Sequence, residues 1–189
     1  SGVITVDNTP IDQLNLKDLR TSIGYVPQEA FLFSDSIKEN IKFGNNNATD
    51  AQVIQAAKDA VVHNNIVDFS KGYDTILGER GITLSGGQKQ RVSIARAIIK
   101  DPQILLFDDS LSAVDTETEE EILSNLKKVA ATKTTILVSH RISSAKNADK
   151  IIILEEGEII QRGTHADLIA EEGYYQELYR KQLDEKEME

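Results

Sequence analysis

Residues 104–109 read Ile-Leu-Leu-Phe-Asp-Asp, a continuous apolar run that ends in two acidic residues. An unbroken apolar run of strand length is typical of a parallel strand buried on both faces. In an α/β domain, such a strand delivers the residues that follow it to the carboxyl edge of the sheet, where ligands bind. Two aspartates after a strand, taken alone, more often form a turn. The assignment of Asp108 and Asp109 to a site therefore depends on their surroundings.

Five more segments have the composition of short strands, because they are rich in β-branched residues and bounded by turn-forming ones. They are residues 2–7, 22–26, 134–139, 150–154 and 158–161. We expect a turn at 8–10 and another at Glu156-Gly157 between the last two strands. Pro27 is expected to end the strand at 22–26, since proline cannot extend a ladder.

Apolar residues at helical spacing dominate residues 34–100. Three helices are expected to begin there, capped by Asp35 or Ser36, by Thr49 and by Ser85. Further helices are expected at residues 117–129, 143–147 and from 165 to the C-terminus. Strands that alternate with helices predict an α/β core with a parallel sheet. The helical stretch is expected to be an insertion packed on that core.

Residues 84–88 read Leu-Ser-Gly-Gly-Gln and are followed by Lys-Gln-Arg. Gly86 and Gly87 leave backbone N–H groups accessible at the start of a helix, and Ser85 adds a hydroxyl. The helix dipole favours an anion at that position. A simple serine N-cap is the alternative interpretation, but Gln88 and the basic residues after it favour anion binding.

One histidine follows a predicted strand. His140 comes directly after residues 134–139, so its imidazole is expected at the same sheet edge as Asp108, where it can hydrogen-bond a terminal phosphate. A lone histidine is usually structural or exposed. His63 and His165 have no comparable placement and receive no chemical role.

The chain has 189 residues, a net charge of −10 and no cysteine. The acidic balance argues against a nucleic-acid partner, which needs a basic face to displace counterions from phosphates. The lack of cysteine excludes disulfides and thiolate metal sites. No apolar run approaches the ~18–20 residues that span a bilayer, so we expect a soluble fragment whose membrane partners lie elsewhere. A first residue of Ser1 in place of Met predicts a fragment or a processed chain.

These motifs, in this order, resemble the nucleotide-binding domain of an ABC transporter from its Q-loop to its C-terminus, and the resemblance covers essentially the whole chain. It implies that Gln28 is the Q-loop glutamine, which touches Mg²⁺ and couples to the membrane domain. It also implies that residues 84–88 are the signature motif. Through Ser85, Gly86, Gly87 and Gln88, that motif closes over ATP held by a second subunit.

The same resemblance gives roles to the residues at the sheet edge. Asp108 matches the Walker B aspartate, which orients Mg²⁺, and Asp109 stands where a catalytic acid polarises the attacking water. His140 matches the switch histidine and Asp115 the D-loop aspartate. Glu79 lies in residues 75–81, which resemble the loop before the signature in exporters. We assign Asp115 and Glu79 to communication across the dimer and with the coupling helices.

A P-loop NTPase-like parallel sheet with an inserted α-helical subdomain follows from the resemblance. Residues 1–33 and 101–189 are expected to form the ATPase core, and residues 34–100 the helical subdomain that ends in the signature helix. The implied ligands are ATP and Mg²⁺. The implied partners are a second nucleotide-binding domain and the coupling helices of a transmembrane domain, at the cytoplasmic face of a membrane.

One departure from the family is the lack of any Gly-x-x-x-x-Gly-Lys-Ser/Thr string in residues 1–189. That loop supplies the backbone cradle, a lysine and a Mg²⁺ hydroxyl for the triphosphate. The core is therefore expected to be incomplete. The strand that carries the loop is missing between the strand ending at Ser139 and the one near Ile151, and unpaired edges remain.

For residues 1–189 alone we expect no measurable ATP hydrolysis, because the largest attractive terms for the triphosphate are missing. A coupled assay with excess Mg²⁺-ATP checks this expectation. Turnover well above a protein-free blank would contradict it.

Asp109 is the second departure, because active family members usually carry Glu at that position. Asp is one methylene shorter, and a misplacement of about 1 Å can cost ~100-fold in rate. An impaired acid beside an intact signature is the pattern of one half of an asymmetric heterodimeric exporter. We favour a heterodimer; a homodimer in which Asp109 works slowly is the alternative.

Other classes of protein explain the sequence less well. ATPases of DNA repair or chromosome structure resemble this core but carry a long coiled coil between Q-loop and signature, whereas Leu84 follows Gln28 by only 56 positions. A translation-type ABC protein needs two such domains and usually a basic surface. A non-hydrolytic interaction fragment, which binds a partner through residues 85–88, remains a description of the chain by itself.

Overall fold

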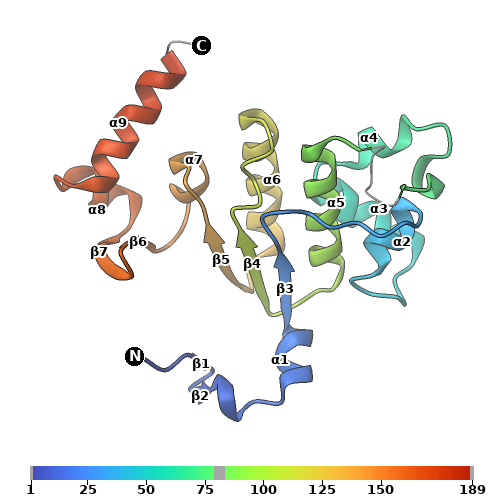
Figure 1. Cartoon of the computed structure of the whole chain (residues 1–189), viewed down its shortest axis with the longest axis horizontal. Helices are drawn as coiled ribbons and strands as arrows, with labels where there is room; N and C mark the ends of the chain where they lie inside the picture. Colours follow the sequence, from blue (N-terminus) through green and yellow to red (C-terminus); the bar gives the residue numbers. More distant parts are fainter. Residues whose placement is uncertain (1, 79–83, 188–189) are drawn as a thin grey trace.

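A three-stranded sheet with the order β3-β4-β5 lies at the centre of the computed structural model, which describes residues 2–78 and 84–187 (Figure 1). Its strands are β3 (Ile23–Val26), β4 (Ile104–Asp108) and β5 (Thr134–Val138), and both pairings are parallel. Val26 lies opposite Phe107, and Asp108 opposite Val138. The parallel sheet predicted from residues 104–109 is confirmed, and its carboxyl ends share one edge.

The expectation that β4 is buried on both faces is wrong in part. Leu105 and Phe107 are fully buried, whereas Ile104, Leu106 and Asp108 are only half-buried. The buried face of the strand packs on the helices, because Leu105 and Phe107 belong to the same apolar cluster as the residues of α5. The other face is covered less completely by the described residues.

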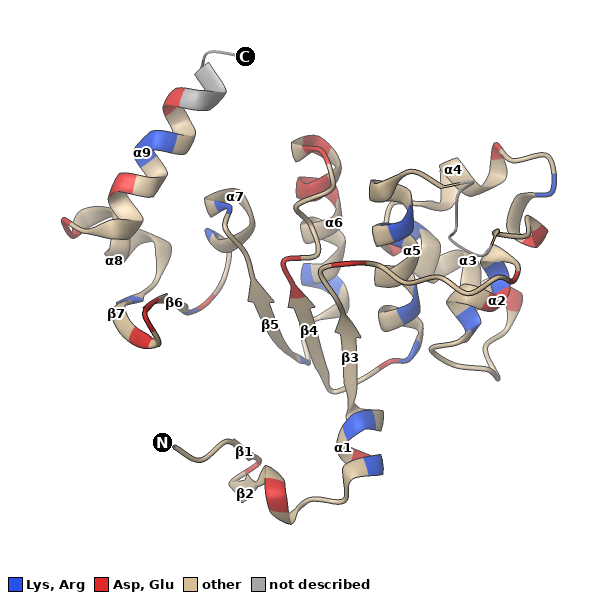
Figure 2. Cartoon of the chain, viewed as in Figure 1, with Lys and Arg blue, Asp and Glu red and all other residues tan. Residues whose placement is uncertain are grey.

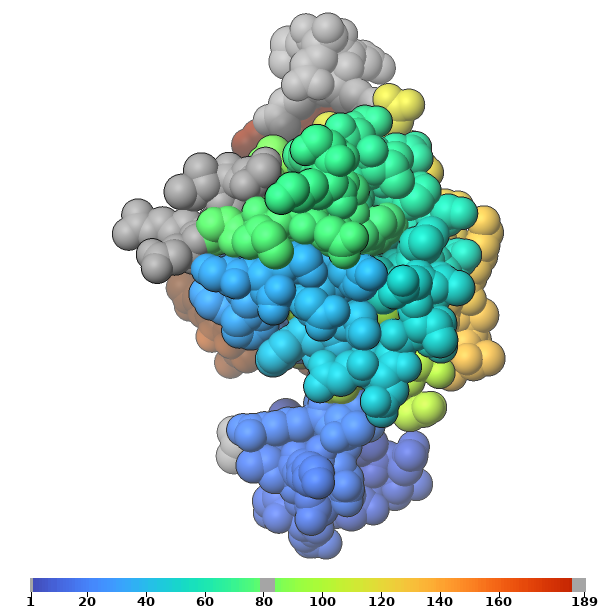
Figure 3. Space-filling view, turned by 90° about the vertical axis from the view of Figure 1, so that its right-hand side faces the viewer, coloured from blue at the N-terminus to red at the C-terminus, as the bar shows by residue number. Residues whose placement is uncertain are grey.

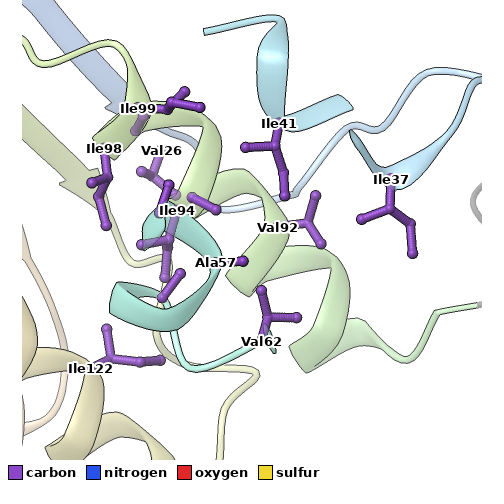
Figure 4. Close-up of a cluster of buried hydrophobic side chains, with 14 of the residues drawn as sticks. Val26, Ile37, Ile41, Ala57, Val62, Val92, Ile94, Ile98, Ile99 and Ile122 are labelled. Carbon is purple, nitrogen blue, oxygen red and sulfur yellow. The ribbon is translucent and has the colours of Figure 1, made fainter. Parts of the chain in front are cut away.

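Helix α5 (Gly86–Ile99) is the centre of the apolar core. Figure 4 shows Val92, Ile94, Ile98 and Ile99 of this helix among side chains from its neighbours. Those neighbours are β3, α2 (Ile37–Lys42), α3 (Asp50–Asp59), α4 (His63–Val67) and α6 (Thr116–Val129). The division into an ATPase core and a helical subdomain at residues 34–100 stays a prediction, and the apolar cluster is continuous across those boundaries.

The predicted helix starts are confirmed at three serine or threonine caps. Ser36, Thr49 and Ser85 each accept a hydrogen bond from the N–H three residues later. Thr49 and Ser85 also form capping boxes, because the glutamine at the third helical position returns a bond to the cap backbone. Asp35, the alternative cap, is not used and accepts instead from the N–H of Ser36.

Charges along α6 follow its dipole. The helix begins after the N-cap Asp115, has acidic residues in its first turn and ends with Lys127 and Lys128. Figure 2 shows the acidic ribbon at one end of α6 and the basic ribbon at the other. Carboxylates near the N-terminus and cations near the C-terminus each stabilise a helix. The helix spans Thr116–Val129, so the predicted range of residues 117–129 is correct to within one residue.

The N-terminal segment forms a lobe of its own below the helical part of the molecule (Figure 3). It contains β1 (Thr5–Val6), β2 (Thr9–Pro10), the short 3-10 helix η1 (Ile11–Gln13) and α1 (Leu16–Ser22). The turn expected at residues 8–10 lies instead at Asp7 and Asn8, which both have positive φ angles. Those two residue types tolerate this conformation, so the hairpin turns early and Pro10 pairs with Thr5.

A hairpin and three helices close the chain. Strands β6 (Ile151–Glu155) and β7 (Glu158–Gly163) are antiparallel and turn at Glu156 and Gly157, as predicted. Helices α7 (Ile142–Ala145), α8 (His165–Ala170) and α9 (Tyr174–Glu187) pack with the hairpin around a second, smaller apolar cluster. Among the described helices, none has both the length and the apolar composition needed to cross a bilayer.

Within the described ranges, β5 pairs only with β4, and β6 belongs to a different sheet. Ile136 and Val138 of β5 are 50% and 47% exposed, and Leu154 of β6 is 67% exposed. This partly uncovered edge lies where the sequence predicts a missing strand. That a strand from outside residues 1–189 occupies it stays a prediction.

Candidate functional site

Asp108 ends β4 and is held by a residue of the neighbouring strand. The phenol of Tyr25 on β3 donates to its Oδ2 at 3.0 Å. This hydrogen bond to the carboxylate is the main reason why the pKa of Tyr25 is raised. The carboxylate is half-buried and sits at the carboxyl edge of the sheet, the position expected for a ligand-binding acid.

Asp109 has a backbone conformation that few residues adopt. Its φ angle is +43°, its N–H donates to the carbonyl of Val138 at 3.0 Å, and its carbonyl accepts from the Ser112 hydroxyl. Nε2 of Gln28 donates to its Oδ2 at 3.3 Å. Left-handed non-glycine residues cluster at functional sites, and Asp is one of the types that tolerates this region. The structure therefore brings Gln28 and Asp109 together.

His140 lies two residues beyond the end of β5. Because β4 and β5 are parallel and Asp109 bonds to Val138, residues 108, 109 and 140 share one edge of the sheet. The side chain of His140 is exposed. The predicted placement of His140 beside the two acids is consistent with this arrangement.

The start of α5 is open to solvent. Ser85 and Gly86 are exposed, and the Ser85 hydroxyl accepts from the Gln88 N–H while Gln88 returns a bond to the Ser85 N–H. The hydroxyl keeps its own proton to donate. The first N–H groups of a helix have no partner within it. The cap and the anion-binding interpretations are therefore compatible.

The two glycines of this helix start differ in their surroundings. A Cβ at Gly87 would come within 3.1 Å of the carbonyl oxygen of Ala113, whereas a Cβ at Gly86 would meet no described atom within 4 Å. Gly87 therefore packs on the loop between β4 and α6. A few positions further along α5, the buried Gln90 donates to the carbonyl of Pro27 at 2.8 Å. Helix α5 is thus attached both to that loop and to the segment before Gln28.

Asp115 ends the loop and caps α6 by accepting from the Thr118 N–H. That bond, and Arg91 more weakly, holds the pKa of Asp115 below its ordinary value. A carboxylate with a lowered pKa contributes stability that is present above the ordinary Asp pKa. This contribution is lost as the pH falls through the lowered pKa. Asp115 is thus charged at neutral pH.

An ion pair between Glu119 and Arg141 stabilises the loop that ends at Asp115. Glu119 is completely buried and accepts from Arg141 Nη1 at 2.7 Å and from the Ser143 and Ser144 hydroxyls. Arg141 also donates to the carbonyls of Ser112 and Val114, each at 3.0 Å. The residue after His140 thereby holds the backbone that leads to Asp115. We call residues 139–142 the switch segment and residues 110–115 the D-loop from here on.

Mg²⁺ is implied by the resemblance, and the donors at this edge suit it. Carboxylate and amide oxygens are its preferred protein ligands, and it usually takes only one or two of them beside phosphates and water. Asp108 and Gln28 supply that number. No group of three or more His, Cys, Asp or Glu side chains able to hold a metal occurs in the described ranges, so a closed protein cage is not formed there.

Some site residues were not predicted. Tyr25, Gln90, Glu119, Arg141 and Gln182 each bond to a predicted site residue or to its loop. Only Glu119 carried a signal, because it shares a helix face with the apolar residues three and seven positions later. Glu79, predicted for domain communication, lies outside the described residues.

Comparisons with known proteins agree with this arrangement. The family model described as ABC transporter matches residues 1–112. The ABC transporter ATP-binding protein YknU of Bacillus subtilis is 51% identical over 187 residues, which cover 99% of this chain and 32% of that protein. ATP-binding cassette sub-family B member 6 of Xenopus tropicalis is 49% identical, with coverage of 96% and 21%.

A multidrug-type relative and a solved exporter extend the likeness. The probable multidrug resistance ABC transporter ATP-binding/permease protein YheI of Bacillus subtilis is 47% identical, with coverage of 96% and 31%. A bacterial Atm1-family ABC exporter with ATP bound superimposes with a TM-score of 0.91 at 43% identity, over 96% of this chain and 32% of that one. The chain thus spans a third or less of the length of these relatives.

Proposed function

Because this chain belongs to the ABC transporter family, we propose that it forms most of an ATP-binding domain that powers export of a substrate across a membrane. The observation that carries the proposal is that separate motifs contact one another through the segments that follow β3 and β4. Gln28 contacts Asp109, Gly87 packs on the D-loop at Ala113, and Gln90 holds the backbone before Gln28. A purely structural cluster would not need an exposed helix start packed on the loop that follows the two acids.

The roles at this edge follow from its chemistry. Asp108 and Gln28 would hold Mg²⁺, which would supply charge neutralisation for the phosphoryl group that is transferred. Asp109 accepts a proton from the attacking water and orients it. The imidazole of His140 donates to the terminal phosphate. Each of these groups ends or follows a strand of the rigid sheet, so the geometry does not depend on a long loop.

The exposed start of α5 serves a nucleotide held by a second subunit. The free hydroxyl proton of Ser85 and the first-turn amides of Gly86 and Gly87 point to an anionic ligand. Gln88 keeps the cap in place through its bond to the Ser85 N–H. The partner is a second ATP-binding domain, and Asp115, at the end of the D-loop, carries communication between the two.

An aromatic patch, formed by Phe31, Phe33 and Phe43, suits the membrane domain. The ring centroids of Phe31 and Phe33 lie 5.1 Å apart, and those of Phe33 and Phe43 lie 4.5 Å apart. The three side chains are 36–62% exposed. Arg96 holds this patch in place. Its guanidinium lies within 5.6 Å of the ring centroids of Phe33 and Phe43. It also donates hydrogen bonds to the carbonyls of Phe31 and Asn40. Exposed aromatic clusters are typical interaction surfaces. We propose that coupling helices dock here, on the cytoplasmic side of the membrane.

The dimer is proposed to be asymmetric. Asp109 places a short acid where the family usually has Glu, whereas residues 84–88 keep the whole signature. The intact signature would then complete the catalytic site of a different partner chain. A homodimer with slow turnover is the alternative.

Gly86→Ala tests the proposal, because the new methyl has room within this chain. Alanine is also the better helix former, by about 1 kcal/mol. We expect unchanged or slightly raised thermal stability. ATP hydrolysis by the polypeptide that contains this chain, assembled with its partner, should fall at least about 10-fold, since the methyl would meet the nucleotide.

Ser124→Ala on the exposed face of α6 is the control, with a smaller gain in helix propensity and no expected change in turnover. Full hydrolysis by Gly86→Ala, together with a normal melting curve, would contradict binding of nucleotide at this helix start.

A further inference from the structure

Gln182 on α9 bonds to the backbone on both sides of Arg141. Its Nε2 donates to the carbonyl of His140 at 3.0 Å, and its Oε1 accepts from the N–H of Ile142 at 2.9 Å. Buried or half-buried backbone groups need such partners. A neighbouring strand would normally provide them. Here a single amide, far along the sequence, holds the segment that carries His140.

The rest of α9 fixes this amide in place. Ile142 is buried in the small apolar cluster together with Tyr175, Leu178 and Tyr179 of α9. Leu178 and Tyr179 lie one turn before Gln182, so the apolar contacts and the amide share one face of the helix. The first turn is attached separately, because the Tyr175 hydroxyl bonds to His165 and its N–H to Gln161.

The switch segment is therefore held at two points. Arg141 joins it to the D-loop and to Glu119 on one side, and Gln182 joins it to α9 on the other. Figure 1 shows α7, which begins at the end of this segment, between the central sheet and α9. The strand pairing of β5 ends at Val138, so among the described residues no strand pairs with the backbone of His140. The position of its imidazole therefore depends on these two attachments.

We propose that Gln182 is a positioning residue for His140, through which the C-terminal helix controls ATP hydrolysis. This inference rests on the proposed function. Loss of the amide frees the switch segment on one side, and the imidazole then spends less time where it meets the terminal phosphate. Binding of ATP itself, which uses other groups, is left nearly unchanged.

The test compares steady-state ATP hydrolysis by the polypeptide that contains this chain in five forms. Each form is assembled with a partner whose own catalytic acid is removed, so that the site lined by His140 supplies the measured turnover. The forms are wild type, Gln182→Leu, Gln182→Glu, Lys181→Ala and His140→Ala. Gln182→Leu keeps the shape but loses both bonds, and we expect kcat to fall about 10-fold with less than about a twofold change in KM. Gln182→Glu keeps the acceptor for the Ile142 N–H, so its kcat should lie between those of wild type and Gln182→Leu. Lys181→Ala, on the exposed face of α9, should match wild type.

The arms separate this inference from the proposed function. If His140→Ala abolishes turnover while Gln182→Leu equals Lys181→Ala, the positioning role is wrong and the proposed function stands. If His140→Ala leaves turnover intact, the proposed role of His140 is wrong and the inference falls with it. Melting curves are recorded for every form. If both Gln182 variants lose activity only in proportion to loss of folded protein, the role is structural and the inference is overturned.

Discussion

Glu119→Ala is expected to lower the free energy of unfolding by about 3 kcal/mol, at the lower end of the range for broken buried ion pairs. Glu119 is 0% exposed, and its removal leaves the Arg141 guanidinium and the Ser143 and Ser144 hydroxyls without their shared acceptor. The loss stays at the lower end because the Arg141 side chain is 37% exposed and can regain water. Glu119→Gln keeps the shape and one acceptor and should cost less.

Urea-induced unfolding of the polypeptide that contains this chain measures the change. Glu120→Ala is the control on the same helix, since its pair with Lys146 at 3.6 Å is half-exposed and should contribute less than about 0.5 kcal/mol. Equal destabilisation by the two alanine variants would mean that the buried pair contributes no more to the free energy of unfolding than the exposed pair. A double variant of Glu119 and Arg141 to leucine should recover much of the loss.

Asp109→Glu is expected to raise ATP turnover at the site that Asp109 lines by up to ~100-fold, because the added methylene moves the carboxylate about 1 Å towards the water that it orients. The catalytic acid of the partner chain is removed for this measurement, so that the turnover of the other site does not mask the gain. Two features of the structure leave room for the change. Asp109 is half-buried at the sheet edge, and its contact with Gln28 is a long one, at 3.3 Å. The gain requires that the signature of the partner chain is competent.

Phosphate release at saturating Mg²⁺-ATP provides the measurement for Asp109→Glu. Asp109→Asn serves as the companion variant, since it keeps the length of the side chain and removes the charge. It should abolish whatever turnover Asp109 supports. If the glutamate variant is no faster than wild type, the short acid is not what limits this site, and the asymmetric heterodimer loses its main support.

Local signals made much of this fold predictable. Ser36, Thr49 and Ser85 were readable as helix caps because a cap bonds to an N–H only three residues away. The strand at residues 104–108 and the hairpin around Gly157 were likewise marked by short-range composition. The turn at Asp7 and Asn8 was misplaced, because Pro10 suggested a turn more strongly than the two residues that make it.

Long-range contacts explain what the sequence did not reveal. Glu119 belongs to a run at residues 117–121 in which the other glutamates are exposed. Its spacing to the buried Ile122 and Leu126 marks its helix face but does not reveal its pairing with Arg141. Gln182 lies in a highly polar helix, and its two bonds join positions 40 and 42 residues apart. No local pattern specifies such partners. The site residues themselves were found because several motifs occur in a fixed order.

The chain has no tryptophan and five tyrosines, so its main ultraviolet fluorescence comes from the tyrosine phenols. One of them, Tyr25, rests directly on the carboxylate of Asp108. A cation that took over this carboxylate would release the phenol and alter its fluorescence. Binding of a cation at Asp108 can therefore be followed by tyrosine fluorescence, without an attached dye.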